Sequence, residues 1–151
     1  MFTKLIKNAV VICDENLVKE EALERIINLA CTEFYIPDCN EIFSMVFERE
    51  TKLSTGIGLE IAVPHCRSEQ VKSVITAAML VPSGIEYNSI DGKPVKLIFL
   101  IISPKNDIQG HIACLSAISH AISDENTRLK LLNSASSDEL YENLTGIGKL
   151  I

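Results

Sequence analysis

One apolar segment constrains the fold more than any other part of the chain. The run VKLIFLIIS at residues 95–103 is almost entirely apolar and rich in β-branched side chains. A strand with one face in water alternates polar and apolar residues, whereas a nearly continuous apolar run is typical of a strand buried on both faces. Such a strand needs helices above and below it. The run therefore predicts the middle of a β-sheet that is covered on both sides.

The rest of the chain supplies strands and helices in alternation. Short apolar runs predict strands, and apolar residues at helical spacing predict helices. Asn40 is expected to cap the second helix, and Ser136 with Glu139 forms a capping box for the last one. The strands are expected at 9–13, 61–63 and 74–81, and the helices at 17–30, 40–50, 111–123, 125–132 and 136–146. This pattern predicts an α/β fold: a single domain over residues 1–151 with a mixed central β-sheet and helices on both faces.

Composition and charge disfavour several classes of ligand. The formal net charge of -6 at pH 7 argues against nucleic acid and anionic membranes and suits a basic protein partner. No window has the apolar length of a membrane span, and the N-terminus lacks the pattern of a secretory signal. The five cysteines are odd in number and scattered, which predicts reduced thiols rather than a disulfide framework. We expect a cytoplasmic protein without membrane insertion and without bound nucleic acid.

The glycine-rich turn in STGIGLEIAVPHCRS, residues 54–68, matches no nucleotide-binding motif. It lacks the Gly-Lys-Ser/Thr ending of a P-loop, and Ile61 stands where a dinucleotide fingerprint needs glycine. The simplest interpretation of Gly56 and Gly58 is backbone geometry at a tight turn. The alternative is that backbone N–H groups of this turn approach an anion closely. No nucleotide or other cofactor is expected.

His65 is the first candidate for chemistry. It follows Pro64 just past an expected strand, so its imidazole is expected at a strand end where the chain turns. His111 lies at the start of an expected helix and on its inward stripe. His120 follows nine residues later, which is about half a rotation of an α-helix, so it points away from His111. A structural role remains the alternative for a lone histidine such as His65.

Two competing sites use the neighbouring thiols. His65, Cys66, His111 and Cys114 supply enough ligands for zinc, but adjacent residues chelate one ion poorly and no Cys-x-x-Cys pair anchors the set. We therefore expect no metal. Cys66 as a catalytic thiol with His111 as its base is the second alternative. The simpler interpretation of Cys66 is a small residue that fills a tight space.

Several blocks together resemble a known family. The blocks are STGIGLEIAVPHCR at 54–67, DGKPVKLIFLIISP at 91–104, GHIACLSAIS at 110–119, DENTRLKLL at 124–132 and ELYENL at 139–144. In order and spacing they resemble the IIA domain of the bacterial phosphotransferase system, fructose/mannitol type, which includes the nitrogen-regulatory IIA-like proteins. The resemblance covers nearly the whole chain.

The resemblance implies a phosphohistidine. In that family the histidine that matches His65 accepts a phosphoryl group through Nε2 from the phosphocarrier protein HPr, a second histidine matches His111, and a site arginine matches Arg49. The chain departs from the family at Glu60, where many members have glycine. We expect this carboxylate to lie close to the phosphate site without removing any phosphate-handling group, and its effect on the rate or the preferred donor stays open.

The residues themselves fit this chemistry. Phosphoryl transfer needs an in-line nucleophile surrounded by cationic or N–H groups. Arg49 offers a fork of donors, His111 one hydrogen bond, and the turn the amides of Gly56, Ile57 and Gly58. No metal or nucleotide is required. The alternatives are that Arg49 pairs with Glu48 or Glu50 in a solvated charge run, and that Arg67 contacts a partner or solvent.

Two functions of different classes follow from the resemblance. In one, the protein relays phosphate from an HPr-like carrier to a cysteine or histidine of a IIB component and so drives sugar uptake. In the other, it is a regulatory binding module whose phosphorylation state controls its partners. The 151 residues contain no fused IIB domain or membrane segment, which slightly favours regulation.

Overall fold

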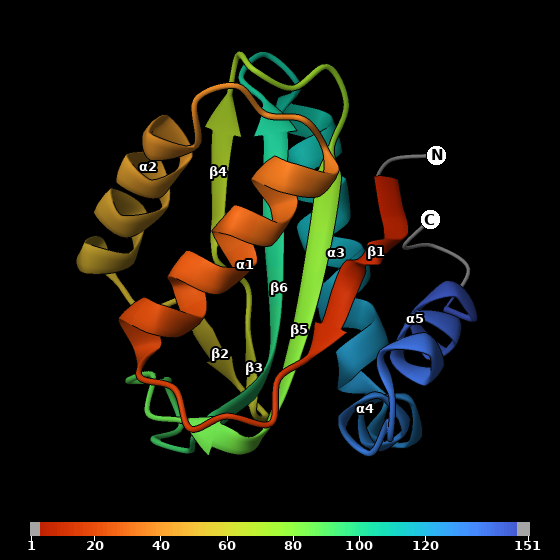
Figure 1. Cartoon of the computed structure of the whole chain (residues 1–151). Helices are drawn as coiled ribbons and strands as arrows, with labels where there is room; N and C mark the ends of the chain where they lie inside the picture. Colours follow the sequence, from red (N-terminus) through yellow and green to blue (C-terminus); the bar gives the residue numbers. More distant parts are fainter. Residues whose placement is uncertain (1–3, 148–151) are drawn as a thin grey trace.

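The computed structural model describes residues 4–147 as one mixed sheet with helices on both faces (Figure 1). The expected fold class is confirmed. The strands run in the order β1-β5-β6-β3-β2, and β4 also pairs with β6. The strands are β1 Lys4–Ile12, β2 Gly56–Gly58, β3 Ile61–Ala62, β4 His65–Ser68, β5 Ile75–Ile85 and β6 Val95–Pro104. The helices are α1 Lys19–Glu33, α2 Cys39–Lys52, α3 Ile108–Ser123, α4 Glu125–Leu132 and α5 Ser137–Thr145.

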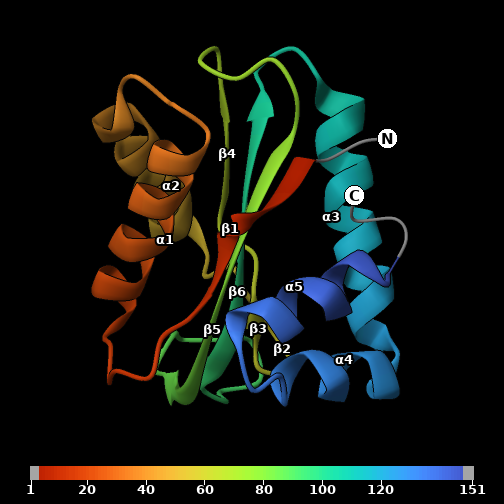
Figure 2. The ribbon, with the colours of Figure 1, turned by 45° about the vertical axis from the view of Figure 1, so that its right-hand side comes forward.

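Two hydrophobic clusters lie on opposite faces of the sheet. Figure 2 shows α1 and α2 on one side and α3, with α4 and α5, on the other. The first cluster joins α1 and α2 to alternate residues of β5 and β6, and the second joins the same strands to the helices that follow β6. The domain is therefore a layered α/β arrangement with the sheet in the middle.

Strand β6 is the centre of the sheet, as its apolar run predicts. It pairs antiparallel with β5 along one edge and parallel with β3 and β4 along the other. Eight of its ten residues are buried in an unbroken run from Leu97 to Pro104. Within β6, Ile98, Leu100 and Ile102 face α1 and α2, whereas Leu97, Phe99 and Ile101 face α3. This alternation decides which face each later site residue occupies.

Strands β3 and β4 form one line beside β6 that is interrupted at Pro64. Ile61 pairs with Leu97 and His65 pairs with Ile101, so the register along β6 is unchanged across the break. Proline has no N–H for the ladder, which explains why the pairing lapses there. The chain was expected to turn at His65, and this expectation is wrong: His65 opens a further strand.

The first strand is longer than its apolar letters suggest. β1 begins at Lys4, whereas the sequence predicts a start at residue 9. Its parallel pairing with β5 shifts register between Leu5 and Val10, so an irregularity separates its two halves. The exposed Lys7 and Asn8 lie in that irregular part. They interrupt the alternation of polar and apolar residues, so the pattern does not predict the first half of the strand.

Helix caps correct two boundaries. Asp38, rather than Asn40, caps α2 by accepting a hydrogen bond from the amide of Glu41 at 3.2 Å. Helix α3 begins at Ile108, three residues before the expected start, because Asp107 caps it. Helix α4 has the expected bounds, and Ser136 caps α5 as expected by accepting from the Glu139 amide.

The cysteines do not all follow the expectation of reduced thiols. Cys31 and Cys39 form a disulfide, with their Cα atoms 5.8 Å apart. The last turn of α1 meets the first turn of α2 across a short connection, and this tertiary contact cannot be read from a spacing of eight residues. Cys66 and Cys114 are buried, as expected.

Within the described residues, no helix combines the length and apolar character that crossing a membrane requires. The seven remaining residues of the predicted domain, 1–3 and 148–151, lie outside the described part of the chain.

Candidate active site

His65 opens β4 with its side chain toward the α3 face of the sheet. Its Nδ1 lies 2.8 Å from the carbonyl oxygen of Val63. A carbonyl oxygen only accepts hydrogen bonds, so Nδ1 carries the proton in the neutral ring. The lone pair of Nε2 is therefore available to an electrophile. The hydrogen bond to Val63 spans Pro64, where the line of strands β3 and β4 is interrupted.

His111 approaches His65 from α3. The two ring centroids are 5.2 Å apart and the ring planes are tilted by 60°. The Nδ1 atom of His111 shares a hydrogen bond of 2.7 Å with the hydroxyl of Ser103, which is fully buried near the end of β6. Ser103 thus fixes one ring nitrogen of His111 and leaves Nε2 for another partner.

The surroundings keep both imidazoles neutral near pH 7. Burial lowers the pKa of His65, and the Arg49 guanidinium acts in the same direction, while the hydrogen bond to Val63 and the Glu50 carboxylate act against it. Burial, together with His65 and Arg67, lowers the pKa of His111 to about 4. A neutral imidazole has one nitrogen with a free lone pair, which can act as a nucleophile, and one N–H group, which can donate a hydrogen bond.

Arg49 reaches the same place from the last turn of α2. Its Nη1 donates to the carbonyl oxygen of Leu53 at 2.9 Å, and none of its other N–H groups has a hydrogen-bond acceptor among the described residues. Among residues 4–147 it makes no ion pair, because Glu48 pairs with Lys52 and Glu50 with Lys19. The alternative of a solvated charge run around Arg49 is therefore not what the structure has.

Two cavities share His65 and Arg49. One, of about 350 Å³, lies between the 53–57 segment and α3, and the other, of about 670 Å³, opens toward His111. Gly56 and Ile57 line the first cavity, whereas Gly58 lines neither. The structure thus brings His65, His111 and Arg49 together with two of the three residues expected from the glycine turn.

The glycine turn is the antiparallel hairpin β2–β3. The amide of Gly56 donates to Ser54 Oγ at 3.1 Å, so this group already has a protein acceptor. A Cβ atom at Gly56 would lie 2.2 Å from Ser89 Oγ, which explains the need for glycine there by close packing. Gly58 has a positive φ of 88° and faces Asp91. Gly58 therefore has the backbone reason that the simpler interpretation supposed, whereas Gly56 is required by close packing.

Comparison with known proteins identifies the family. Residues 4–146 match the family described as phosphoenolpyruvate-dependent sugar phosphotransferase system, EIIA 2. The chain belongs to this family. The expected resemblance to IIA domains of the fructose/mannitol type is confirmed.

Relatives of this EIIA 2 domain carry two kinds of name. The PTS system fructose-specific EIIA component of Haloferax volcanii is 31% identical over 129 residues, which cover 85% of this chain and 84% of that protein. The nitrogen regulatory protein of Pseudomonas aeruginosa is 32% identical over 124 residues, 82% of this chain and 80% of that protein.

Solved structures share the fold. The nitrogen regulatory protein IIA-Ntr of Neisseria meningitidis superposes with a TM-score of 0.82 at 28% identity and covers 92% of this chain and 94% of its own. The mannitol enzyme IIA of Escherichia coli, in a complex with phosphorylated enzyme IIB, gives a TM-score of 0.78 at 23% identity and covers 95% and 99%.

Glu60, where this EIIA 2 domain departs from the family pattern, lies away from the site. It occupies the turn of the β2–β3 hairpin with a φ of 67°, and its carboxylate pairs with Lys96 at 3.3 Å. The next residue, Ile61, pairs with Leu97 and His65 pairs with Ile101, so they lie four positions, about 13 Å, apart along β6. The expectation that Glu60 places a carboxylate close to the phosphate is therefore wrong. The positive φ gives a physical reason for glycine at this position in other members.

Replacing Glu60 with glutamine is expected to leave the rate of phosphorylation unchanged within about twofold, since its charge is half-exposed, paired and remote. The rate is measured with a phosphorylated HPr-like carrier as donor. A change of about tenfold or more would show that this turn takes part in the reaction after all.

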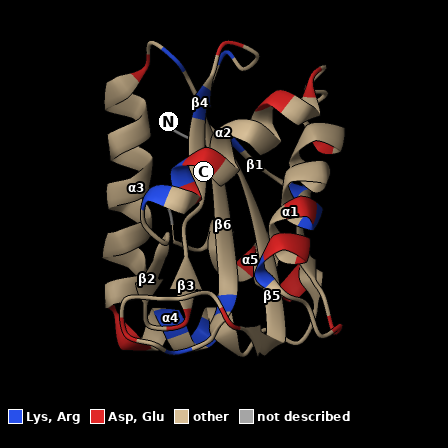
Figure 3. Ribbon diagram, turned by 90° about the vertical axis from the view of Figure 1, so that its left-hand side faces the viewer, with Lys and Arg blue, Asp and Glu red and all other residues tan. Residues whose placement is uncertain are grey.

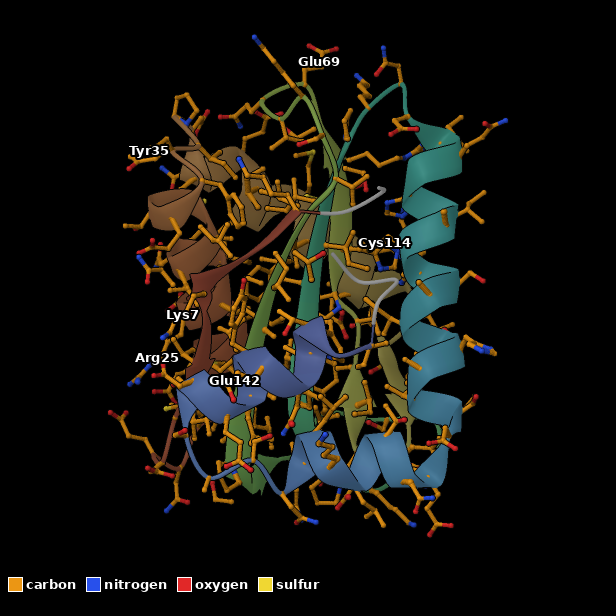
Figure 4. All side chains as sticks on the ribbon, turned by 90° about the vertical axis from the view of Figure 1, so that its right-hand side faces the viewer. Lys7, Arg25, Tyr35, Glu69, Cys114 and Glu142 are labelled. Atoms are coloured by element: carbon orange, nitrogen blue, oxygen red, sulfur yellow. A yellow bond between two sulfur atoms is a disulfide. The ribbon has the colours of Figure 1, made fainter. Side chains whose placement is uncertain are left out.

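The competing zinc and thiol sites do not form. Cys66 belongs to the cluster under α1 and α2, while Cys114 lies in the opposite cluster, between α3 and the sheet (Figure 4). The four side chains of the expected zinc alternative therefore cannot converge on one ion. Burial raises the pKa of the Cys66 thiol to about 12, so it is not a thiolate near neutral pH.

The rim of the site does not share the acidic character of the whole chain. Arg49, Lys52, Arg67 and Lys105 line the larger cavity with a single carboxylate, Glu48. Figure 3 shows that α3 carries no Lys, Arg, Asp or Glu, while several acidic residues lie on α1. Exposed apolar side chains also line the two cavities: Leu53, Ile57 and Ile90 in the smaller one and Ile108 in the larger one. The net charge of the chain therefore does not describe the rim of the site.

Sequence reasoning missed two residues beside the site. Ser103 was treated only as a strand end, although its place in the alternation after Phe99 and Ile101 puts it on the α3 face. Glu50 was treated as part of a surface charge run, although it follows Ile42 and Val46 at intervals of four and so lies on the buried stripe of α2.

The two site histidines are expected to titrate below the ordinary histidine value of about 6.5, with His111 the lower. Because the unfolded chain protonates His111 near 6.5 and the folded protein near 4, the free energy of unfolding decreases as the pH falls through this window. Ring C–H chemical shifts measured through the acid and neutral range report both midpoints. A His111 midpoint at or above 6.5 would contradict the site geometry.

Proposed function

We propose that this protein accepts a phosphoryl group on Nε2 of His65 from an HPr-like phosphohistidine carrier and acts as a cytoplasmic phosphocarrier of the phosphotransferase system. Membership of the EIIA 2 family supports phosphoryl transfer as the chemistry. The observation that carries the assignment to His65 is the hydrogen bond from its Nδ1 to Val63, since it leaves Nε2 as the nucleophile.

The step balances without a metal or cofactor. The lone pair of Nε2 forms the new P–N bond, and the breaking P–N bond returns its electron pair to the donor histidine. The ring of His65 gains positive charge as it is phosphorylated, and the Nδ1–H bond to the Val63 carbonyl strengthens as that charge develops.

The neighbouring groups surround the transferred phosphoryl. We propose that the guanidinium N–H groups of Arg49 donate hydrogen bonds to the equatorial oxygens of the transferred phosphoryl group. With Ser103 donating to Nδ1 of His111, Nε2 of His111 carries the proton and donates to the same group. The amides of the glycine turn have a smaller part, because Gly56 already donates to Ser54 and Gly58 lies outside the two cavities.

Intact mass after incubation with phosphoenolpyruvate, enzyme I and HPr tests the proposal. We expect one acid-labile phosphate on the wild type, none on His65→Ala, and one on the matched control His120→Ala, since His120 is exposed at the far end of α3. A His65→Ala protein that still takes phosphate, or a wild type that takes none from an active donor, would refute the assignment.

What happens to the phosphate distinguishes the two functions: a relay that passes it to a IIB component, or a regulatory switch that keeps it. The fructose-specific name of one relative and the complex of mannitol IIA with phosphorylated IIB support transfer onward to a IIB component. The nitrogen regulatory names of other relatives support the alternative, a binding module controlled by phosphorylation. Rapid loss of phosphate on addition of a IIB domain would identify the relay. A phosphorylated form that persists beside IIB domains and binds a different protein would identify the switch.

A further inference from the structure

A buried carboxylate lies directly behind the proposed phosphoryl site. Glu50 follows Arg49 on the last turn of α2, and only 8% of its surface is exposed. Its Oε1 accepts from the Thr55 amide at 2.9 Å and from Lys19 Nζ at 2.8 Å, and its Oε2 accepts from Thr55 Oγ1 at 2.6 Å. Both oxygens are thus committed to protein donors, which is what a buried carboxylate requires.

The hydroxyl groups around Glu50 have a fixed direction. A carboxylate only accepts, so Thr55 donates its proton to Glu50 and must accept at its own oxygen from Tyr87, whose hydroxyl lies 3.1 Å away. Burial raises the pKa of Tyr87, which keeps this hydroxyl protonated. The hydrogen bonds therefore run in one direction: the Tyr87 hydroxyl donates to Thr55, and the Thr55 hydroxyl donates to Glu50.

Lys19 balances the charge of Glu50. Its Nζ also donates to the carbonyl oxygen of Tyr87 at 3.2 Å and lies 4.3 Å from the centre of the Tyr87 ring. Its side chain is 18% exposed, unlike the surface pairs elsewhere in the described chain. We call Lys19, Glu50, Thr55 and Tyr87 the Glu50 network. It ties the starts of α1 and β2 to the end of α2 and to the loop after β5.

The Glu50 network supports the 54–56 segment, which forms the wall of the cavity opposite His65. Arg49, Ser54, Thr55 and Gly56 line the same cavity as His65. Ser54 Oγ donates to the carbonyl of Tyr87 at 2.9 Å while it accepts from the Gly56 amide, so the wall is bonded to the network on two sides. Because Lys19 and Thr55 occupy the Glu50 carboxylate, it does not neutralise the adjacent guanidinium.

We propose that Glu50, with Lys19 as its counter-charge, is a positioning residue for phosphoryl transfer to His65: it fixes Arg49 and the 54–56 wall and stays electrically balanced. This inference rests on the proposed function of His65. It follows that the rate of phosphoryl transfer depends on the charge balance between Glu50 and Lys19 as much as on the position of Arg49. Without Lys19, an uncompensated carboxylate lies within electrostatic reach of the incoming phosphoryl anion.

Four variants test the network: Lys19→Met, Glu50→Gln, the double variant, and Tyr87→Phe. At saturating phosphorylated carrier we expect kcat to fall about tenfold in each of the first two, with KM for the carrier within about twofold, because the loss concerns orientation rather than docking. The double variant restores charge balance and is expected to regain part of the loss. Tyr87→Phe removes only one hydroxyl and is expected to lower kcat about threefold.

A second readout needs no phosphate and separates this inference from the proposed function. The Arg49 Nε–H resonance of the free protein is expected to shift in Glu50→Gln and to stay in place in Glu24→Gln, a matched loss of one carboxylate on the exposed face of α1. If Glu50→Gln does not fold, Tyr87→Phe carries both measurements.

The outcomes are distinct. A wild type that is phosphorylated while Lys19→Met, Glu50→Gln and Tyr87→Phe keep the wild-type kcat and the Arg49 resonance would overturn the positioning role alone. Lower thermal stability without a change in kcat would do the same, because it would make the network merely structural. A wild type that takes no phosphate would overturn the proposed function, and this inference with it.

Discussion

Replacing Arg49 with alanine is expected to slow phosphorylation of His65 by about 10²-fold, the loss typical of removing one donor aimed at developing charge. Arg49 lines both cavities that contain His65. Among the described residues its guanidinium makes no ion pair, and one of its N–H groups donates to the carbonyl oxygen of Leu53. Single-turnover phosphorylation by the phosphorylated carrier measures the rate.

Two further variants make the Arg49 result specific. Arg49→Lys keeps the charge and loses the planar fork, so its rate is expected between those of the wild type and the alanine variant. Arg25→Ala removes a guanidinium that pairs with Glu15 in a different cavity, and its rate is expected to match the wild type. Equal rates for Arg49→Ala and Arg25→Ala would remove Arg49 from the site.

Replacing Phe99 with alanine is expected to lower the free energy of unfolding by about 3–5 kcal/mol. Phe99 is 1% exposed in the central strand β6, and its ring fills the space between the sheet and the α3 side. A typical domain has only about 5–15 kcal/mol in total, so this one change removes a large share of the stability. Urea unfolding measures it.

Ile90→Ala is the matched control for the core, since it also truncates a large apolar side chain. Ile90 is 85% exposed in the loop after β5, so its truncation is expected to change the free energy of unfolding by less than about 0.5 kcal/mol. If Phe99→Ala lost no more than Ile90→Ala, β6 would not be the centre of the core.

The parts of the fold that follow from local pattern were predictable. β6 has an unbroken apolar run, and α4 has capping and turn residues at both ends, so both were placed with nearly correct bounds. β4 has the letters His-Cys-Arg-Ser and no apolar pattern, and its strand character comes from pairing with β6. Such pairing depends on what lies alongside in space, which one sequence does not specify.

The site likewise contains features that the sequence predicts and features that depend on tertiary contacts. His65, His111 and Arg49 were named from motif and resemblance, and the structure brings them together. The Cys31–Cys39 disulfide and the pair of Glu60 with Lys96 were not foreseen, because each depends on a tertiary contact. Glu50 was within reach of the sequence: helical periodicity places it on the buried stripe, but a charged letter in a charged run suggested the surface.

The most direct test of the central claim is to find which nitrogen carries the phosphate, by NMR of the phosphorylated, 15N-histidine-labelled protein through phosphorus–nitrogen and ring-proton couplings. The account predicts a single phosphoryl group on Nε2 of His65, because the Nδ1 proton is held by the Val63 carbonyl. A phosphoryl group on Nδ1 of His65, or on His111 or His120, would contradict it.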